Sequence, residues 1–212
     1  LIAHEDNNKT YDIYKATNLC VFWLNSFCAI GMYICLEPAM EIWLGKNYLM
    51  GKTVVAVLMV SFYVSGMRRA ITIVKTKAGI FHEDRFAPLF EAIINLVSSI
   101  ILVQFLGING IFLGTIISTL AVPFWTAPYL VYKKVFKRSP WIYFIEYILY
   151  TIVGLITCVI TVLLCDFIPN EGLILGLLGK VIISAIVPNL IYVLIFHRKK
   201  EFKYLWGIAK TM

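Results

Sequence analysis

A run of 41 consecutive residues, 92–132, contains no Asp, Glu, Lys or Arg. The clearest interruption is the polar, glycine-containing segment Gly107-Ile108-Asn109-Gly110. The hydrocarbon core of a bilayer is about 30 Å thick, and a helix needs about 20 apolar residues to cross it. The run therefore predicts two membrane-spanning helices that are joined by a tight turn.

The composition of the whole chain agrees with a membrane protein. Of its 212 residues, 60% are hydrophobic and 15% are charged, whereas an average soluble domain has about 25% charged residues. The net charge of +7 could indicate nucleic-acid binding. In a membrane chain, however, it favours basic loops on the cytoplasmic side, so we expect no nucleic-acid partner.

Apolar segments predict an all-α, polytopic fold with six transmembrane helices. The predicted spans are residues 16–36, 49–71, 86–106, 108–132, 141–165 and 172–196. They divide the chain into a cytoplasmic loop (1–15), four helices (16–132), a basic cytoplasmic loop (133–140), two further helices (141–197) and a basic amphipathic cytoplasmic tail (198–212). Glu37-Pro38 is expected to close the first span, and the longest connection is expected at residues 72–85.

The distribution of Lys and Arg predicts the orientation. Sixteen of the 19 basic residues fall in the first loop, the tail and every second connection, whereas the opposite side holds only Lys46 and Lys52. Because cytoplasmic loops carry an excess of basic residues, this pattern predicts a multi-pass protein of the cell membrane with both ends in the cytoplasm.

The first loop is polar and has no signal-peptide layout, so we expect the chain to be the C-terminal part of a longer protein. Its five cysteines lie inside apolar runs and form no Cys-x-x-Cys pair. Buried cysteine acting as a small hydrophobic residue is the interpretation we favour, and neither a metal site nor a cofactor is expected.

Apart from Lys52, Arg68 and Arg69, which lie near the ends of the second span and must extend their side chains toward water, three charged residues lie within predicted spans: Glu91, Glu146 and Lys180. Charges at membrane depth are costly and usually face a bundle interior or a water-filled cavity. The alternative is that both carboxylates are wetted at the interface and that Lys180 extends its side chain outward. The sequence leaves both interpretations open.

The third span is unusually polar. Asn95 lies four residues after Glu91 and shares its helix face, and Ser98, Ser99 and Gln104 follow. Such a helix could line a cavity, or its polar groups could form hydrogen bonds to a neighbouring helix.

Several segments resemble the oligosaccharide/polysaccharide flippase family, which belongs to the superfamily of the MATE exporters. They are Gly79-Ile80-Phe81-His82-Glu83-Asp84-Arg85, Ala87-Pro88, Glu91-Ala92-Ile93-Ile94-Asn95-Leu96, Gly107-Ile108-Asn109-Gly110-Ile111 and Gly114-Thr115-Ile116-Ile117-Ser118. The resemblance covers about residues 15–140, and beyond Trp141 it rests on hydropathy alone.

The resemblance implies a two-lobe transporter of twelve to fourteen helices, of which these six would be the last. It implies that an isoprenoid-diphosphate-linked oligosaccharide is moved from the inner to the outer leaflet for polysaccharide export. The implied partners are this substrate, membrane lipids, a coupling ion (H⁺ or Na⁺) and polysaccharide-assembly proteins. The alternatives are a drug/ion antiporter of the same superfamily and a membrane enzyme of surface-glycan assembly. For such an enzyme, the outer loops offer mainly Glu37, Glu41, Lys46 and Lys52.

Moving a diphosphate through a low-dielectric layer requires fixed cations and hydrogen-bond donors. We expect Arg85 to bind the diphosphate, because a guanidinium can grip phosphate oxygens bidentately. Asn95 is expected to bind sugar hydroxyls. Glu91 is expected to pair with Arg85, which must then lie in the loop before the helix, or to carry a proton. Lys180 is a further, weaker candidate for substrate binding.

Overall fold

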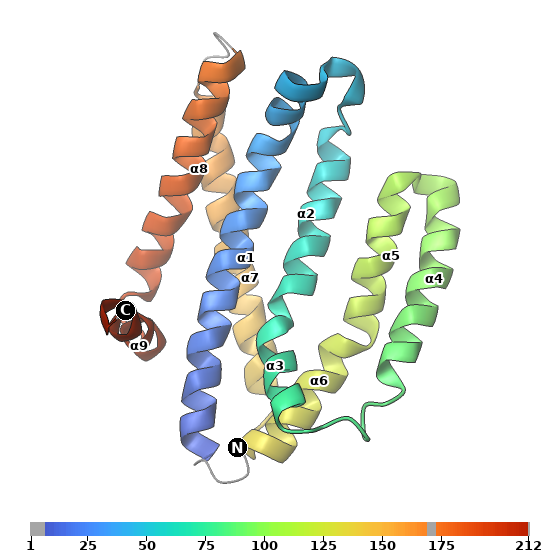
Figure 1. Cartoon of the computed structure of the whole chain (residues 1–212), viewed down its shortest axis with the longest axis vertical. Coiled ribbons are helices and arrows are strands. Elements are labelled where there is room, and N and C mark those ends of the chain that lie inside the picture. Colours follow the sequence, from blue (N-terminus) through green and yellow to red (C-terminus); the bar gives the residue numbers. More distant parts are fainter. Residues whose placement is uncertain (1–6, 169–172, 212) are drawn as a thin grey trace.

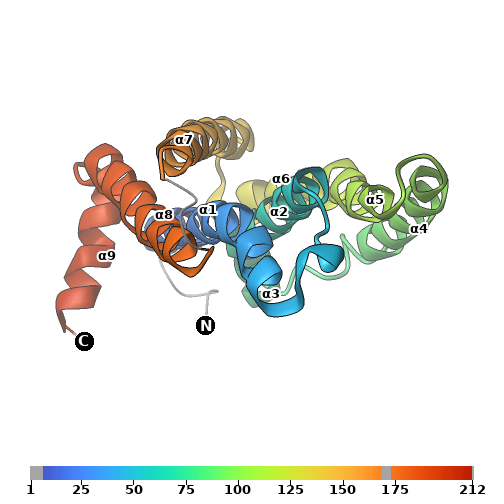
Figure 2. The same cartoon turned by 90° about the horizontal axis from the view of Figure 1, so that it is seen from above.

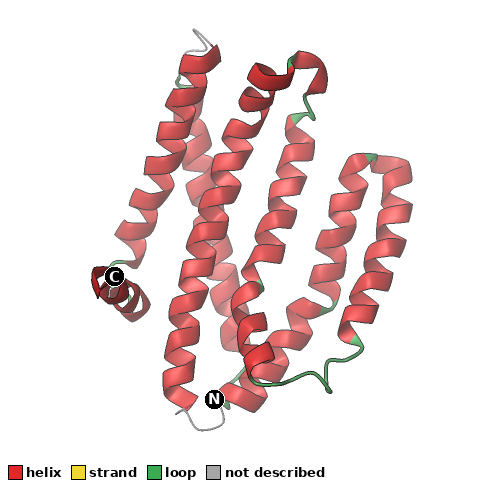
Figure 3. Cartoon of the chain, viewed as in Figure 1, coloured by secondary structure: helices red, strands yellow, loops and turns green. Residues whose placement is uncertain are grey.

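The computed structural model describes residues 7–168 and 173–211, and in this part of the chain every regular element is helical (Figure 3). The elements are α1 (Asn7–Leu44), η2 (Lys46–Tyr48), α2 (Lys52–Met67), α3 (Arg69–Lys77), α4 (Ala87–Leu106), α5 (Ile108–Ala121), α6 (Pro123–Val131), the π-helical segment η3 (Tyr132–Phe136), α7 (Trp141–Asp166), α8 (Leu173–Phe196) and α9 (Lys200–Thr211). The start of the predicted first loop (1–6), the connection 169–172 and residue 212 lie outside the described residues.

The predicted all-α architecture with six membrane-length helices is confirmed. The six candidate spans are α1, α2 with α3, α4, α5 with α6 and η3, α7, and α8. Five of them form a row in the order α8, α1, α2, α5 and α4, and α7 lies on one face of that row (Figures 1 and 2). The short helix α9 runs across the end of α8. These spans indicate a multi-pass membrane protein, and the side of the membrane on which each connection lies stays a prediction.

The first helix is longer than predicted at both ends. It begins at Asn7, inside the expected loop 1–15, and continues through Pro38 to Leu44. Tertiary packing holds its early turns, since Tyr14 is 1% exposed and its ring centroid lies 5.1 Å from that of Phe136. A proline inside a membrane helix is tolerated where the freed carbonyl finds a partner or water.

Two predicted cytoplasmic loops are also partly helical. Helix α3 continues to Lys77 and packs the buried side chain of Val74, although residues 72–85 were expected to be loop. The segment η3 occupies the first part of the expected loop 133–140, because Val135 and Phe136 are buried. The helix ends at Phe136, and the next residue, Lys137, has a left-handed φ of 52°.

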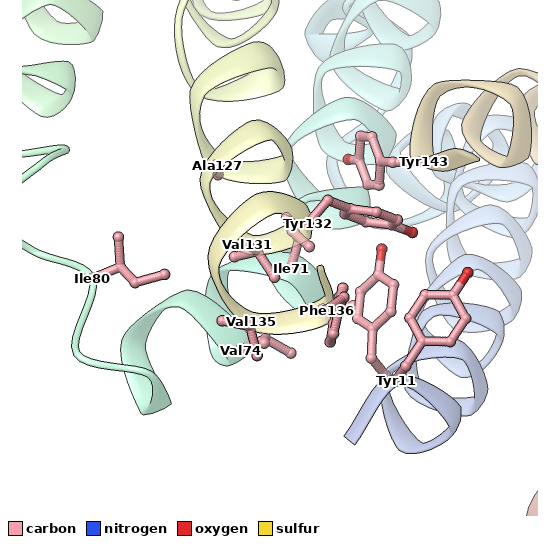
Figure 4. Packing of buried hydrophobic residues seen from close by; sticks show 12 residues of the cluster. Tyr11, Ile71, Val74, Ile80, Ala127, Val131, Tyr132, Val135, Phe136 and Tyr143 are labelled. Carbon is pink, nitrogen blue, oxygen red and sulfur yellow. The ribbon is translucent and has the colours of Figure 1, made fainter. Parts of the chain in front are cut away.

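Two clusters of buried side chains hold the bundle together. The larger cluster joins the start of α1 to α3, α6, η3 and the start of α7 (Figure 4). Its members are Tyr11, Tyr14, Ala70, Ile71, Val74, Ile80, Ala127, Val131, Tyr132, Val135, Phe136 and Tyr143. The second cluster joins α1, α2, α7 and α8 through Leu19, Phe22, Met67, Tyr150, Tyr192 and Phe196. Helix α4 contributes to neither, since none of its 20 residues is buried, and it is held mainly by α5.

The orientation can be tested with single cysteines at exposed positions. Asn47 lies in η2 at one end of the bundle, whereas Thr76 and Ser139 lie near the ends of α3 and η3. We expect Asn47→Cys to react with a membrane-impermeant maleimide in intact cells, and Thr76→Cys and Ser139→Cys to react only after the cells are opened. All three side chains are exposed, so burial does not protect them. Labelling of the second pair in intact cells would contradict the predicted orientation.

Candidate functional site

The loop that precedes α4 is fixed by two ion pairs. Lys75 pairs with Asp84, whose side chain is 5% exposed, and Lys134 of η3 pairs with Glu83. The hydrogen bond from Lys134 lowers the pKa of the Glu83 carboxyl, because it stabilises the charged form. Both acidic residues of this loop therefore already have basic partners.

Arg85 lies between these acids and α4, two residues before the helix begins at Ala87, as predicted. Its side chain is exposed. One guanidinium nitrogen lies 3.4 Å from Nε2 of His82, and the group lies 4.7 Å from the centroid of the Phe86 ring. Arg85 forms no ion pair with any described residue, so most of its N–H donors are available to an anion.

Glu91 does not pair with Arg85, which corrects the first of its two predicted roles, whereas the second, carrying a proton, stays a prediction. It accepts a hydrogen bond of 2.6 Å from Arg68, and the side chains of the two residues are 24% and 35% exposed, respectively. Arg68 lies at the junction of α2 and α3. It reaches Glu91 from the preceding span in the chain, whereas the guanidinium of Arg85 remains beside Phe86. Only one feature of the sequence could have indicated this pair: an acidic residue lies within one span, and a basic residue lies near the end of the preceding span.

Asn95 lies in the interface between α4 and α5. Its Nδ2 donates hydrogen bonds to Oγ1 of Thr115 at 3.2 Å and to Oγ of Ser118 at 3.3 Å. Ser99 donates to the carbonyl of Ile111 in the same interface. The polar face of α4 therefore serves helix–helix hydrogen bonding. The other interpretation of this helix, that it lines a cavity, stays a prediction.

Glu146 forms part of a cluster that the sequence did not reveal. Lys15 of α1 forms an ion pair with Glu146 of α7 and lies 3.6 Å from Glu201 of α9. Lys15 and Glu146 are each 16% exposed. The cluster ties α9 to the bundle, and with 16% of its side chain exposed Glu146 is not fully wetted.

Lys180 lines a cavity of about 460 Å³ at the opposite end of the bundle from Arg85, which we call the end pocket. Helices α1, α2, α7 and α8 form its walls, and its charged lining consists of Glu37, Glu41, Lys52, Asp166 and Lys180. Lys180 is half-buried and forms no ion pair with any residue in the described ranges. Pro38 and Ile34 also line the end pocket, so water can reach the carbonyl that the proline frees.

The four predicted site residues do not form one site. Arg85 and the Arg68–Glu91 pair lie near the start of α4, Asn95 is engaged between two helices, and Lys180 lies in the end pocket. Among residues 7–168 and 173–211, no group of three His, Cys, Asp or Glu side chains is arranged to hold a metal ion. Chemically, the arrangement offers an exposed guanidinium at one end and a pocket with charges of both signs at the other.

No family model, curated protein or solved structure matches this chain.

Proposed function

We propose that this chain supplies the last six helices of a flippase for isoprenoid-diphosphate-linked oligosaccharides. The observation that carries the proposal is the end pocket, a charged cavity between four helices of membrane length. Ionisable groups that face a cavity within a membrane bundle commonly mark the path of a substrate or an ion.

Two features support an anionic, polar substrate. Lys180 is half-buried in the end pocket and has no carboxylate within ion-pairing distance in the described part of the chain. At the other end, Arg85 is exposed while its two acidic neighbours are paired with lysines. A cation without a protein counter-charge is suited to a phosphate, and such charge-assisted hydrogen bonds are among the strongest that side chains form.

The lining of the end pocket also supports a second candidate, a drug/ion antiporter. Its three carboxylates, Glu37, Glu41 and Asp166, outnumber its two lysines, and carboxylates favour a cationic cargo. The two functions can be separated by deleting the gene that encodes this chain. Loss of surface glycan with unchanged resistance to lipophilic cations supports the flippase, whereas the reverse result supports the antiporter.

The role of the end pocket can be tested with a matched pair of lysine variants. We expect Lys180→Gln to lower glycan export by about tenfold, because it removes a charge-assisted contact. Lys46→Gln serves as the control, since Lys46 lies at the same end but is 83% exposed and lies 3.7 Å from Glu41. Export is measured as surface glycan per cell at equal protein levels. If the two variants exported equal amounts of glycan, the end pocket would not be part of the transport path.

A further inference from the structure

A second cavity lies between α6 and α7, at the end of the bundle that carries the basic segment 133–138. Its volume is about 600 Å³, within the range of about 300–1,000 Å³ that is typical of small-ligand pockets. We call it the aromatic pocket and define it by Trp125, Thr126, Tyr129, Lys133, Trp141 and Phe144. None of these residues was among the predicted site residues.

The rings of this pocket form a connected apolar surface. The centroid of Phe144 lies 4.8 Å from that of Trp125 and 5.8 Å from that of Trp141. Trp125 is nevertheless 51% exposed and Trp141 is 67% exposed. Aromatic side chains are common at membrane interfaces, but here they line a hollow. Such a surface suits an apolar chain that lies against the ring faces.

No carboxylate is among the side chains that line the aromatic pocket, so its hydrogen-bond donors have no anionic acceptor there. The ammonium of Lys133 donates a hydrogen bond of 2.8 Å to the hydroxyl of Tyr129 and lies 4.5 Å from the centroid of that ring. Lys133 has no carboxylate within ion-pairing distance among the described side chains, whereas the next residue, Lys134, pairs with Glu83. The hydroxyl of Thr126 is buried and has no hydrogen-bond partner.

The ammonium of Lys133 is exposed and has no counter-charge, and charge-assisted hydrogen bonds to phosphate oxygens are among the strongest that side chains form. A phosphate oxygen would accept a hydrogen bond from this ammonium, and an apolar chain attached to that phosphate would cover the rings. We propose that the aromatic pocket binds the phosphate group of a lipid, with the ammonium of Lys133 on the phosphate and the chain against Trp125 and Trp141.

Two kinds of molecule carry this chemistry: an isoprenoid phosphate and an anionic phospholipid of the bilayer. The inference does not depend on the proposed flippase function, because a phospholipid alone would account for the pocket. The probes must therefore separate the two sources.

The test is native mass spectrometry of the full chain in detergent, with farnesyl diphosphate, farnesol, phosphatidylglycerol and inorganic phosphate as probes. We expect farnesyl diphosphate or phosphatidylglycerol to bind, and Lys133→Gln to weaken that binding by about tenfold or more through loss of a charge-assisted contact. Lys134→Gln is the matched control, since it removes the same charge one residue away.

A preference for farnesyl diphosphate would support the proposal and identify the isoprenoid source, whereas a preference for phosphatidylglycerol would support it and identify the bilayer. The latter result leaves the flippase proposal to the export assay. Three results would overturn the inference: equal loss of binding in the two lysine variants, farnesol binding as tightly as its diphosphate, or competition by inorganic phosphate as strong as that by the lipid.

Discussion

Replacing Gly110 by alanine is expected to destabilise the protein by about 1–3 kcal/mol, the usual cost of overpacking. A Cβ atom at this position would lie 2.3 Å from the carbonyl carbon of Leu102 and 2.4 Å from the amide nitrogen of Val103. Both are backbone atoms of α4, so no side-chain rotation can relieve the clash. Because α4 is held mainly by α5, the substitution should loosen the whole hairpin.

The sign of this effect is informative, because alanine normally favours a helix over glycine by about 1 kcal/mol. Gly31 of α1 is the matched control, since a Cβ there meets no heavy atom within 4 Å. We expect Gly31→Ala to leave stability unchanged or to raise it. The measurement is thermal or dodecyl-sulfate unfolding of the purified variants. If Gly110→Ala were as stable as Gly31→Ala, the close approach of α4 and α5 would be wrong.

The number of spans could be predicted because membrane crossing is a local property of sequence. A long run without charged residues is unfavourable in water, so residues 92–132 predict two membrane helices and the turn near Gly107. In the structure, α4 and α5 meet at that turn, and Gly107 has a φ of 57°.

The helix ends could not be predicted because distant contacts determine them. Asn7 and Phe136 lie outside the apolar runs, and their segments are helical because the rings of Tyr11 and Phe136 pack 5.1 Å apart. Hydropathy indicates where a helix enters lipid but carries no information on how far it continues through packing outside the lipid.

The charged positions could be predicted, but not their partners. Glu91 and Lys180 stood out because charge is rare within spans. Arg68 approaches Glu91 from 23 residues away in sequence, and four separate helices build the pocket around Lys180. Such pairings depend on which helices are neighbours, and helix periodicity reports only residues on the same helix.

Arg85→Ala is expected to abolish glycan export at normal protein levels. The guanidinium of Arg85 has no carboxylate partner in the described part of the chain, and the ion pairs of Glu83 and Asp84 hold its loop in place. Its removal should therefore cost a substrate contact and little stability. Arg85→Lys should retain charge but lose the bidentate geometry, which predicts export reduced by about tenfold. Arg69→Ala is the control, since Arg69 is also exposed and its loss changes the net charge equally.

The effect of Glu91 should be separate from that of Arg85, because Glu91 is paired with Arg68. Glu91→Gln would leave Arg68 without a counter-charge at the edge of the membrane, so we expect reduced export together with reduced thermal stability. Removing both charges of the pair, in the double variant Arg68→Gln/Glu91→Gln, should recover part of that stability.

The double variant Arg85→Lys/Glu91→Gln should show the sum of the two single effects on export, since residues without a shared partner act independently. A double-mutant coupling between Glu91 and Arg85 larger than that between Glu91 and Arg68 would contradict the observed pairing. Full export by both Arg85→Ala and Glu91→Gln would exclude this end of α4 from substrate binding.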